Sequence, residues 1–236
     1  MPNSLKDPKL TFDTNLYGAL NLYQAIIELK FNPKILFVGS ADEYGIVNEN
    51  DLPIKEECPL RPMNPYSISK ASADLLSYAY FKNYNLNIIR VRPFNHIGSR
   101  QSPEFVCSSF AKQIAEIEKG MKEPVIMVGN LEAKRDFTDV RDMVRAYWLA
   151  LNKGEPGEVY NICSGRVIQI REFLNNLLKL SSKVIKIMAD PKRIRSSDNP
   201  ILQGDYSRFR RKTSWEPEIP LDETLRDTLE YWRKIL

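Results

Sequence analysis

Short, continuous apolar runs alternate with segments of helical periodicity along this chain. Apolar residues recur at helical spacing from Thr14 to Lys30, and the run Ile35-Leu36-Phe37-Val38 follows and ends at Gly39. A second pair consists of a helical segment from about Tyr66 to Asn83 and the apolar run from Asn87 to Val91. Because a short apolar run bounded by turn signals is typical of a fully buried strand, the alternation predicts an α/β fold with a parallel sheet covered by helices.

The rest of the chain continues this pattern. Ser102-Pro103-Glu104 has the order of an N-cap, a first-turn proline and a first-turn acid, which predicts a helix that begins there and stops at Gly120. Further strands are expected at Val125–Val128, Glu158–Ile162 and Val184–Met188, and further helices at Val140–Leu151, Ile170–Leu180 and Asp222–Ile235.

Length and charge limit the classes of protein that fit. A chain of 236 residues is long enough for one large domain or two interlocked ones. The 34 Lys and Arg residues exceed the 30 Asp and Glu residues by only four, which is too small an excess to indicate a nucleic-acid partner. The one markedly basic stretch runs from Asp190 to Lys212.

Cysteine and histidine usage narrows the class further. Cys58, Cys107 and Cys163 are far apart and odd in number, which favours a reducing compartment over a disulfide framework. His96 is the only histidine, so a His-rich metal site is excluded. No run approaches the roughly 18 apolar residues of a membrane helix, and the N-terminus lacks the apolar core of a signal peptide. We therefore expect a cytoplasmic protein.

Candidate catalytic residues gather where the first two strands end. In open parallel sheets, ligands bind beyond the carboxyl ends of the strands, which here open into the loops 39–45 and 92–98. Tyr66 and Lys70 lie one helical turn apart on the segment between them. A nearby ammonium favours the phenolate, so we expect Lys70 to lower the pKa of Tyr66 toward the range of an acid/base catalyst. Ser40 could hydrogen-bond the same substrate oxygen.

The Tyr/Lys spacing alone is weak evidence. With 11 tyrosines, roughly one such match is expected by chance, and Tyr78 with Lys82 is indeed a second one. Twelve residues turn a helix by about 120°, so both pairs cannot face one site. We favour Tyr66 because it follows Asn64-Pro65 at a helix start, near the expected sheet-edge site; the alternative is a solvated helix face.

These residues carry a resemblance to a known family. Ser40, Tyr66 and Lys70, with Asn15 in the preceding helix, resemble the catalytic set of the extended short-chain dehydrogenases/reductases, which act on nucleotide sugars. The stretches 92–98, 129–142 and 190–198 resemble, more narrowly, the GDP-4-dehydro-6-deoxy-D-mannose reductases. This resemblance covers nearly the whole chain.

The resemblance implies a Rossmann-like fold, a bound NADP or NAD, and reduction of a C4 ketone to GDP-D-rhamnose. It gives catalytic roles to Ser40, Tyr66 and Lys70, cofactor contacts to Asn15, Tyr66, Lys70 and His96, and contacts with the GDP-sugar to Asn95, Arg135, Arg195 and Asp198. Arginine suits a pyrophosphate because its planar fork makes paired, charge-assisted hydrogen bonds. The alternative is a structural role for His96 and a solvated face for the Arg193/Arg195 cluster.

The same resemblance implies a domain division. Residues 1–97 and 131–165 correspond to the NAD(P)-binding Rossmann domain, and residues 98–130 and 166–236 to a sugar-nucleotide-binding domain. The family's first strand and its Gly-x-x-Gly-x-x-Gly turn have no counterpart in this sequence, so we expect an N-terminally truncated domain that lacks roughly 70 residues, two βαβ-sized pieces. The dinucleotide pyrophosphate would then lose its glycine turn.

Two other functions stay open. GDP-mannose 4,6-dehydratase is a close relative that needs an acidic base beside Ser40, and Asp42 occupies that position. A non-catalytic remnant that binds sugar nucleotide or dimerises is the other. The resemblance further implies a homodimer through helices 14–30 and 66–83, with Tyr23, Tyr78 and Phe81 as apolar surface. We expect no nucleic-acid or membrane partner.

Overall fold

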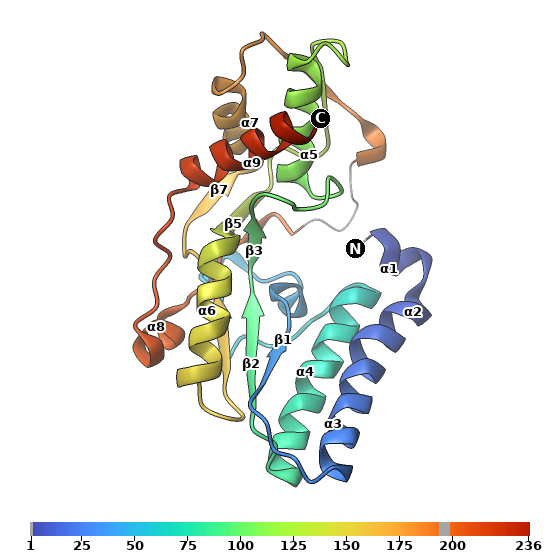
Figure 1. The fold of residues 1–236 in the computed structure, drawn as a ribbon, viewed down its shortest axis with the longest axis vertical. Helices are drawn as coiled ribbons and strands as arrows, with labels where there is room; N and C mark the ends of the chain where they lie inside the picture. Colours follow the sequence, from blue (N-terminus) through green and yellow to red (C-terminus); the bar gives the residue numbers. More distant parts are fainter. Residues whose placement is uncertain (1, 194–198) are drawn as a thin grey trace. The chain divides into compact units, whose positions relative to one another are not determined.

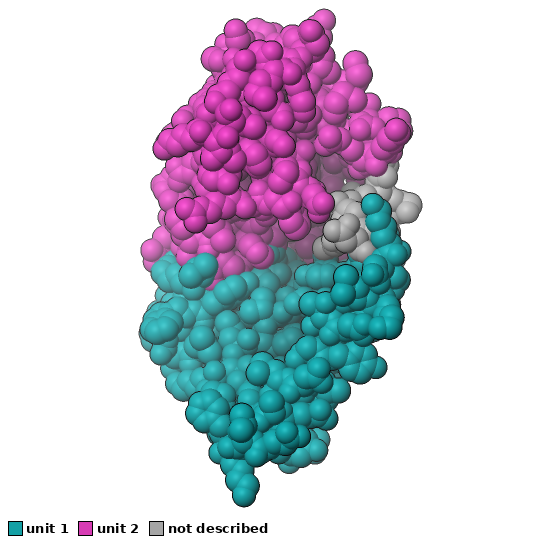
Figure 2. Space-filling view, turned by 45° about the vertical axis from the view of Figure 1, so that its right-hand side comes forward, with its two compact units in different colours: residues 1–94, 144–165, 204–216 teal, residues 95–143, 166–203, 217–236 magenta. Residues whose placement is uncertain are grey.

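The computed structural model describes residues 2–193 and 199–236 (Figure 1). The chain forms two compact units, which Figure 2 distinguishes by colour. Unit 1 consists of residues 1–94, 144–165 and 204–216, and unit 2 of residues 95–143, 166–203 and 217–236. Residues 131–143 thus belong to unit 2 and residues 204–216 to unit 1, whereas the sequence analysis grouped both segments the other way; the roles of the two parts stay a prediction.

Unit 1 contains a parallel sheet in the order β1-β2-β6. Its strands are β1 (Ile35–Val38), β2 (Ile88–Pro93) and β6 (Val159–Ile162). Every residue of β2, the central strand, is buried, as expected for a strand with neighbours on both edges and helices on its faces. The predicted parallel sheet is confirmed.

Helices cover both sides of this sheet. Helices α3 (Gly18–Glu28) and α4 (Pro65–Tyr84) pack together on one side, and α6 (Val140–Lys153) lies on the other (Figure 1). Tyr23 and Ile26 of α3 meet Phe37 and Ile88 of the sheet in the core between these layers. The helical segment begins earlier than predicted, with α1 (Pro2–Lys6), α2 (Pro8–Phe12) and a π-helical stretch, η1 (Asp13–Tyr17).

The ends of α4 follow from its sequence. Asn64 accepts a hydrogen bond from the Ser67 amide (2.9 Å) and Pro65 occupies the first turn, so the helix starts at a fixed residue. It ends at Asn85, whose φ of 54° is tolerated by asparagine in the left-handed region. Short 3₁₀ helices, η2 (Ala41–Tyr44) and η3 (Glu49–Asp51), follow β1, and α8 (Ser207–Thr213) completes unit 1.

Unit 2 is built around a separate apolar core. Its helices are α5 (Val106–Glu118), α7 (Ile170–Lys179) and α9 (Leu221–Ile235), which share a core that includes Phe110, Phe173 and Leu229. Its strands are β3 (Asn95–Ile97), β4 (Val125–Val128), β5 (Lys134–Asp139), β7 (Val167–Gln169), β8 (Lys186–Ala189) and β9 (Ile201–Leu202), and a 3₁₀ helix, η4, covers Pro191–Arg193. β5 lies between β3 and β7 and also pairs with β9, while β4 pairs with β8.

One predicted helix start is wrong. Helix α5 begins at Val106 after Phe105, and the Ser102 hydroxyl accepts the Glu104 amide (3.3 Å) in a turn before it. Ser102-Pro103-Glu104 therefore serves a turn, because the same residue types favour turns and helix caps. Among the described residues, no helix is both long and apolar enough to cross a membrane.

Candidate active site

The loop after β1 presents Ser40. The Ser40 hydroxyl oxygen accepts the Asp42 amide (3.2 Å), and the Ser40 amide donates to Glu43 Oε1 (2.7 Å). This reciprocal capping box fixes Ser40 at the start of η2, directly beyond the sheet edge where the sequence predicts a ligand site.

Helix α4 supplies the other two predicted catalytic residues. Tyr66 lies in its first turn, where interaction with the Ser40 side chain lowers the pKa of the phenol. One turn later, the Lys70 ammonium donates to the carbonyl of Val38 at the end of β1 (3.0 Å) and lies 5.9 Å from the centre of the Phe37 ring. The structure thus brings Ser40, Tyr66 and Lys70 together at the carboxyl end of β1.

The acid/base properties of this group differ from the expectation. Burial raises the pKa of Tyr66; the hydrogen bond with Ser40 lowers it, and the negative charges of Asp42 and Glu43 raise it further. Burial also lowers the pKa of Lys70, against the charge of Glu43. The expected lowering of the Tyr66 pKa is therefore wrong, because desolvation of the phenol is the largest cause of the shift and raises the pKa.

Asn15, which lies near the start of the sequence, contacts the same helix. It lies in the π-helical stretch η1, and its side-chain amide donates to the Ser69 hydroxyl (2.9 Å). Ser69 in turn donates to the carbonyl of Tyr66 (2.8 Å). Asn15 thereby holds the first turns of α4, and a local π-helix is a recurrent feature of functional sites.

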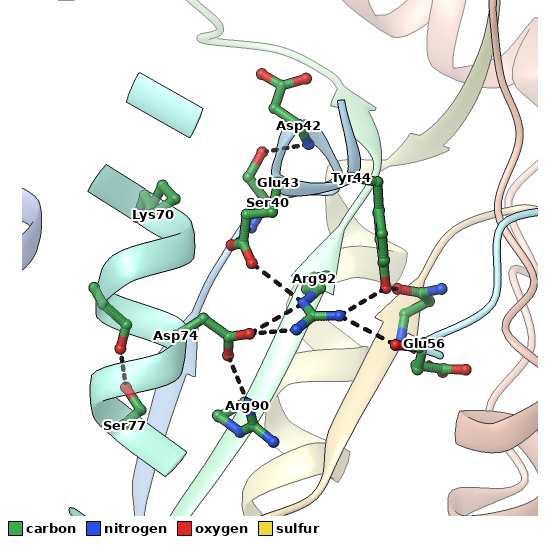
Figure 3. Close-up of polar contacts among 12 residues, drawn as sticks. Ser40, Asp42, Glu43, Tyr44, Glu56, Lys70, Asp74, Ser77, Arg90 and Arg92 are labelled. Carbon is green, nitrogen blue, oxygen red and sulfur yellow. Dashed lines mark hydrogen bonds and ion pairs between the residues drawn. The ribbon is translucent and has the colours of Figure 1, made fainter. Parts of the chain in front are cut away.

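Below these residues lies a buried polar network that the sequence analysis missed (Figure 3). Arg92 of β2 lies 3.2 Å from Glu43 Oε2 and donates from Nε (3.2 Å) and Nη2 to Asp74 of α4. Arg90 donates to the other oxygen of Asp74 (3.2 Å). Arg92 Nη1 also donates to the hydroxyl of Tyr44 (3.1 Å). Two carboxyl groups and two guanidiniums thus meet away from water, where each buried charge needs a partner.

The phenol of Tyr147 lies close to that of Tyr66. Tyr147 of α6 is half-buried, and burial first and the proximity of Tyr66 second raise its pKa. The sequence analysis assigned Tyr147 only to a helix, since nothing in its neighbourhood along the chain marks it.

The alternative Tyr/Lys pair lies elsewhere on α4. Lys82 stacks over the Tyr78 ring at 5.6 Å, and the Arg90 guanidinium lies 4.9 Å from the same ring. Tyr78 is 41% exposed. Its contacts are those of a surface aromatic ring covered by cations.

The predicted sugar-nucleotide residues that the structure describes belong to unit 2, as does His96, which is predicted to contact the cofactor. Asn95 and His96 of β3 have exposed side chains, and the His96 carbonyl accepts the Gln101 side-chain amide (2.8 Å). Arg135 of β5 donates to the carbonyl of Asn199 (2.6 Å). Arg195 and Asp198 lie outside the described residues.

The residues at the end of β1 fit the nicotinamide end of a dinucleotide. Lys70 is a half-buried ammonium one turn from Tyr66, and both lie where an open parallel sheet takes its ligand. Tyr66, Lys70 and Asn15 would hold the nicotinamide riboside there.

Comparison with known proteins shows which family this chain belongs to. The family model described as GDP-mannose 4,6 dehydratase matches residues 1–228. This chain belongs to that family. It is 38% identical to the GDP-6-deoxy-D-mannose reductase of Pseudomonas aeruginosa over 98% of this chain and 76% of that protein. It is 30% identical to the GDP-mannose 4,6 dehydratase of Cricetulus griseus over 93% of this chain and 64% of that protein.

Solved structures of nucleotide-sugar enzymes share the fold of this family member. The structure of RMD from Pseudomonas aeruginosa complexed with NADPH superposes with a TM-score of 0.95 at 37% identity, over 100% of this chain and 78% of that one. A UDP-glucose 4-epimerase from Thermus thermophilus in complex with NAD gives a TM-score of 0.87 at 28% identity, over 99% and 74%. The predicted Rossmann-like α/β class and the resemblance to short-chain dehydrogenases/reductases are confirmed.

Proposed function

We propose that this chain carries the catalytic residues of a GDP-4-dehydro-6-deoxy-D-mannose reductase, which reduces the C4 ketone of the sugar to give GDP-D-rhamnose. The observation that carries this proposal is the meeting of Ser40, Tyr66 and Lys70 at the end of β1. The likeness to the Pseudomonas reductase supports the choice of reaction, since it exceeds that to the hamster dehydratase.

Reduction of the C4 ketone needs one proton and one hydride. When bound, NADPH or NADH supplies the hydride. Tyr66 supplies the proton to the ketone oxygen, and its raised pKa keeps the phenol protonated at neutral pH. The Ser40 hydroxyl, whose oxygen accepts the Asp42 amide, would turn its hydrogen from Tyr66 to the same ketone oxygen when substrate is bound. Lys70 orients the cofactor ribose.

The GDP part of the substrate is assigned to unit 2. Arg135, Arg195 and Asp198 would bind the GDP moiety and Asn95 the nucleotide sugar, while His96 would contact the cofactor. Arg135 is half-buried and near the carbonyl of Asn199, so part of its donor fork is already oriented.

The position of Asp42 supports a second reaction, that of a dehydratase. Asp42 follows Ser40 by two residues, and its negative charge raises the pKa of Tyr66, which supports a role beside the phenol. A GDP-mannose 4,6-dehydratase requires such a base, and Asp42 would serve as one.

The decisive experiment offers two substrates. The purified chain, and a version extended by the family's N-terminal glycine-rich region, are incubated with GDP-mannose alone and with GDP-4-dehydro-6-deoxymannose plus NADPH. Oxidation of NADPH in the second mixture supports the reductase, and loss of water from GDP-mannose supports the dehydratase. If the extended version does neither yet binds GDP-sugar, the non-catalytic reading holds.

We also propose a cytoplasmic homodimer. Among the described residues, Cys58, Cys107 and Cys163 form no disulfide, which suits a reducing compartment. Exposed apolar side chains on α3 and α4, such as Leu22 and Leu75, favour a second copy as partner. Tyr23, by contrast, is 1% exposed and bonds Ser77 (2.7 Å), so its predicted place on the dimer surface is wrong.

A further inference from the structure

Glu43 is a fully buried carboxylate at the edge of the candidate active site. Its residue is 0% exposed. Oε1 accepts the backbone amide of Ser40 (2.7 Å), and Oε2 lies 3.2 Å from Nε of Arg92. Oε1 is hydrogen-bonded, whereas Oε2 has no hydrogen-bond partner and meets Arg92 only as an ion pair when the group is charged.

Arg92 continues the connection into α4. Its guanidinium donates to Asp74, which also accepts from Arg90 (3.2 Å). Asp74 lies one helical turn beyond Lys70 and two beyond Tyr66. A continuous series of charged contacts therefore runs from the Ser40 amide through β2 to the helix that carries Tyr66 (Figure 3).

The backbone beside Glu43 is shaped to admit the carboxylate. A Cβ at Gly39 would lie 2.4 Å from Glu43 Oε1 and 3.1 Å from the carbonyl of Val91. Glycine at this position leaves the space that Glu43 occupies. The carboxylate is thus built into the strand end, independently of its bonds to Ser40 and Arg92.

We propose that Glu43 is a positioning residue, which holds Ser40 against the Arg92–Asp74 pair and so sets the place of the Ser40 hydroxyl relative to Tyr66. This inference rests on the proposed function, in which Ser40 and Tyr66 both hydrogen-bond the same ketone oxygen. Glu43 itself touches Ser40 only through the backbone, so it acts on the site through Ser40.

Several charged groups face Glu43. Asp74 and Lys70 come from α4 and Arg92 comes from β2, and the charge of Glu43 in turn acts on Tyr66. Burial first and Asp74 second raise the pKa of Glu43 to about 8, against Arg92 and the Ser40 amide. Above this pH the carboxylate is charged and attracts Arg92; as the pH falls below it, the charge and that attraction are lost.

The test is a spectroscopic titration of Tyr66 in Glu43→Gln. The amide keeps an oxygen for the Ser40 N–H but turns its NH₂ toward Arg92, so it cuts the connection to α4. Each protein is titrated by phenolate absorbance, with its own Tyr66→Phe version subtracted. If Ser40 moves away, Tyr66 loses a hydrogen bond that lowers its pKa, and we expect the Tyr66 pKa to rise by about 0.5 to 1.

A purely electrostatic role predicts the opposite sign. The charge of Glu43 raises the pKa of Tyr66, so its simple removal would lower that pKa. A fall, or no change, overturns the proposal. The matched control is Glu56→Gln, since the Glu56 side chain is also largely buried (4% exposed) and accepts a backbone amide, that of Asn161 (2.9 Å). An equal rise in this control would show general loosening and would also overturn the proposal.

A second measurement uses the unaltered chain, in case Glu43→Gln does not fold. The Glu43 carboxyl carbon and the Ser40 amide are followed by NMR across the pH range. We expect the Ser40 amide resonance to move with the same midpoint as the Glu43 carboxyl. A Ser40 resonance that stays constant through that midpoint contradicts the proposal. Neither measurement needs substrate or cofactor, so its failure is distinct from failure of the reductase assay.

Discussion

Tyr66 and Lys70 share one face of α4, but different partners hold them. The phenol meets Ser40 from the loop after β1, and the ammonium meets the carbonyl of Val38 within that strand. Burial shifts both pKa values toward the uncharged form. In the chain by itself, the pair therefore favours a neutral proton donor, which matches the direction of the proposed reduction.

Removing the phenolic hydroxyl should remove the proton donor alone. We expect Tyr66→Phe, in the version extended by the N-terminal region, to lower turnover by about 10²–10⁴-fold while GDP binding is kept. Turnover is measured by the oxidation of NADPH, and GDP binding is measured by calorimetry. Tyr78→Phe is the control, because Tyr78 belongs to the surface pair with Lys82. Equal losses in both variants would show that Tyr66 is not the proton donor.

The sequence predicted Ser40, Tyr66 and Lys70 because two local rules apply to them. One is the helical spacing of the Tyr/Lys pair, and the other is the position of the loop after an apolar run. The Ser-x-x-Glu spacing of a capping box is a local rule that links Glu43 to the Ser40 amide, but it does not predict that the carboxyl group is buried. A carboxylate in a loop is ordinarily solvated, and its burial depends on Arg92 and Asp74, which only the tertiary fold brings to it.

At the scale of elements, the start of α4 sets where Tyr66 lies. Tyr66 is two residues after the Asn64 cap, so fraying of the first turn would displace it. We expect Asn64→Ala to destabilise the chain by about 1 kcal/mol, measured by urea unfolding, because the Ser67 amide loses its acceptor. Asn64→Asp keeps a capping oxygen and should lower the free energy of unfolding by only about a few tenths of 1 kcal/mol. Equal losses for both would contradict a capping role.

Helices α5 and α9 are joined by an ion pair with a definite pH dependence. Arg233 donates to both oxygens of Glu118 (2.7 Å each), and this hydrogen bonding lowers the pKa of Glu118. A lowered carboxyl pKa contributes stability that is present above the ordinary pKa of glutamate and is lost as the pH falls through the lowered value.

We therefore expect Glu118→Gln to lower the free energy of unfolding by about 1 kcal/mol at neutral pH, a value kept small because Arg233 is partly exposed. The difference from the unaltered chain should disappear in acid. Urea unfolding across pH measures it. Glu230→Gln, which removes the more exposed partner of Arg233, should have a smaller effect. A difference that persists in acid would exclude the ion pair as its cause.

The elements that the sequence predicted are those with a clear apolar period. β1 and β4 lie at the predicted residues, and α4 differs by one residue at each end. β5 was missed because its sequence, Lys134-Arg135-Asp136-Phe137-Thr138-Asp139, is mostly polar. Its last four residues are nevertheless buried, and Asp139 is held there by Arg141 (2.9 Å) and Thr224 (2.7 Å), partners that a strand pattern does not contain.

For the whole molecule, the exposed apolar side chains of unit 1 mark two separate surfaces. Leu22 of α3 and Leu75 of α4 are 52% and 58% exposed, on the pair of helices proposed as the dimer interface. Val144 and Trp148, one turn apart on α6, are 60% and 67% exposed. Either surface could bury apolar area against another chain, so the two must be tested separately.

Replacing Leu22 and Leu75 by Arg should convert a dimer into a monomer. A symmetric interface places each substituted residue in both copies, so four buried positive charges would oppose association. Both side chains are exposed in the single chain, so the fold itself should tolerate the change. Light scattering after size-exclusion chromatography measures the mass. Trp148→Arg is the matched control, which should stay dimeric. A monomer from Trp148→Arg beside an unchanged dimer from the double variant would move the interface to α6, and a monomeric unaltered chain would refute the dimer.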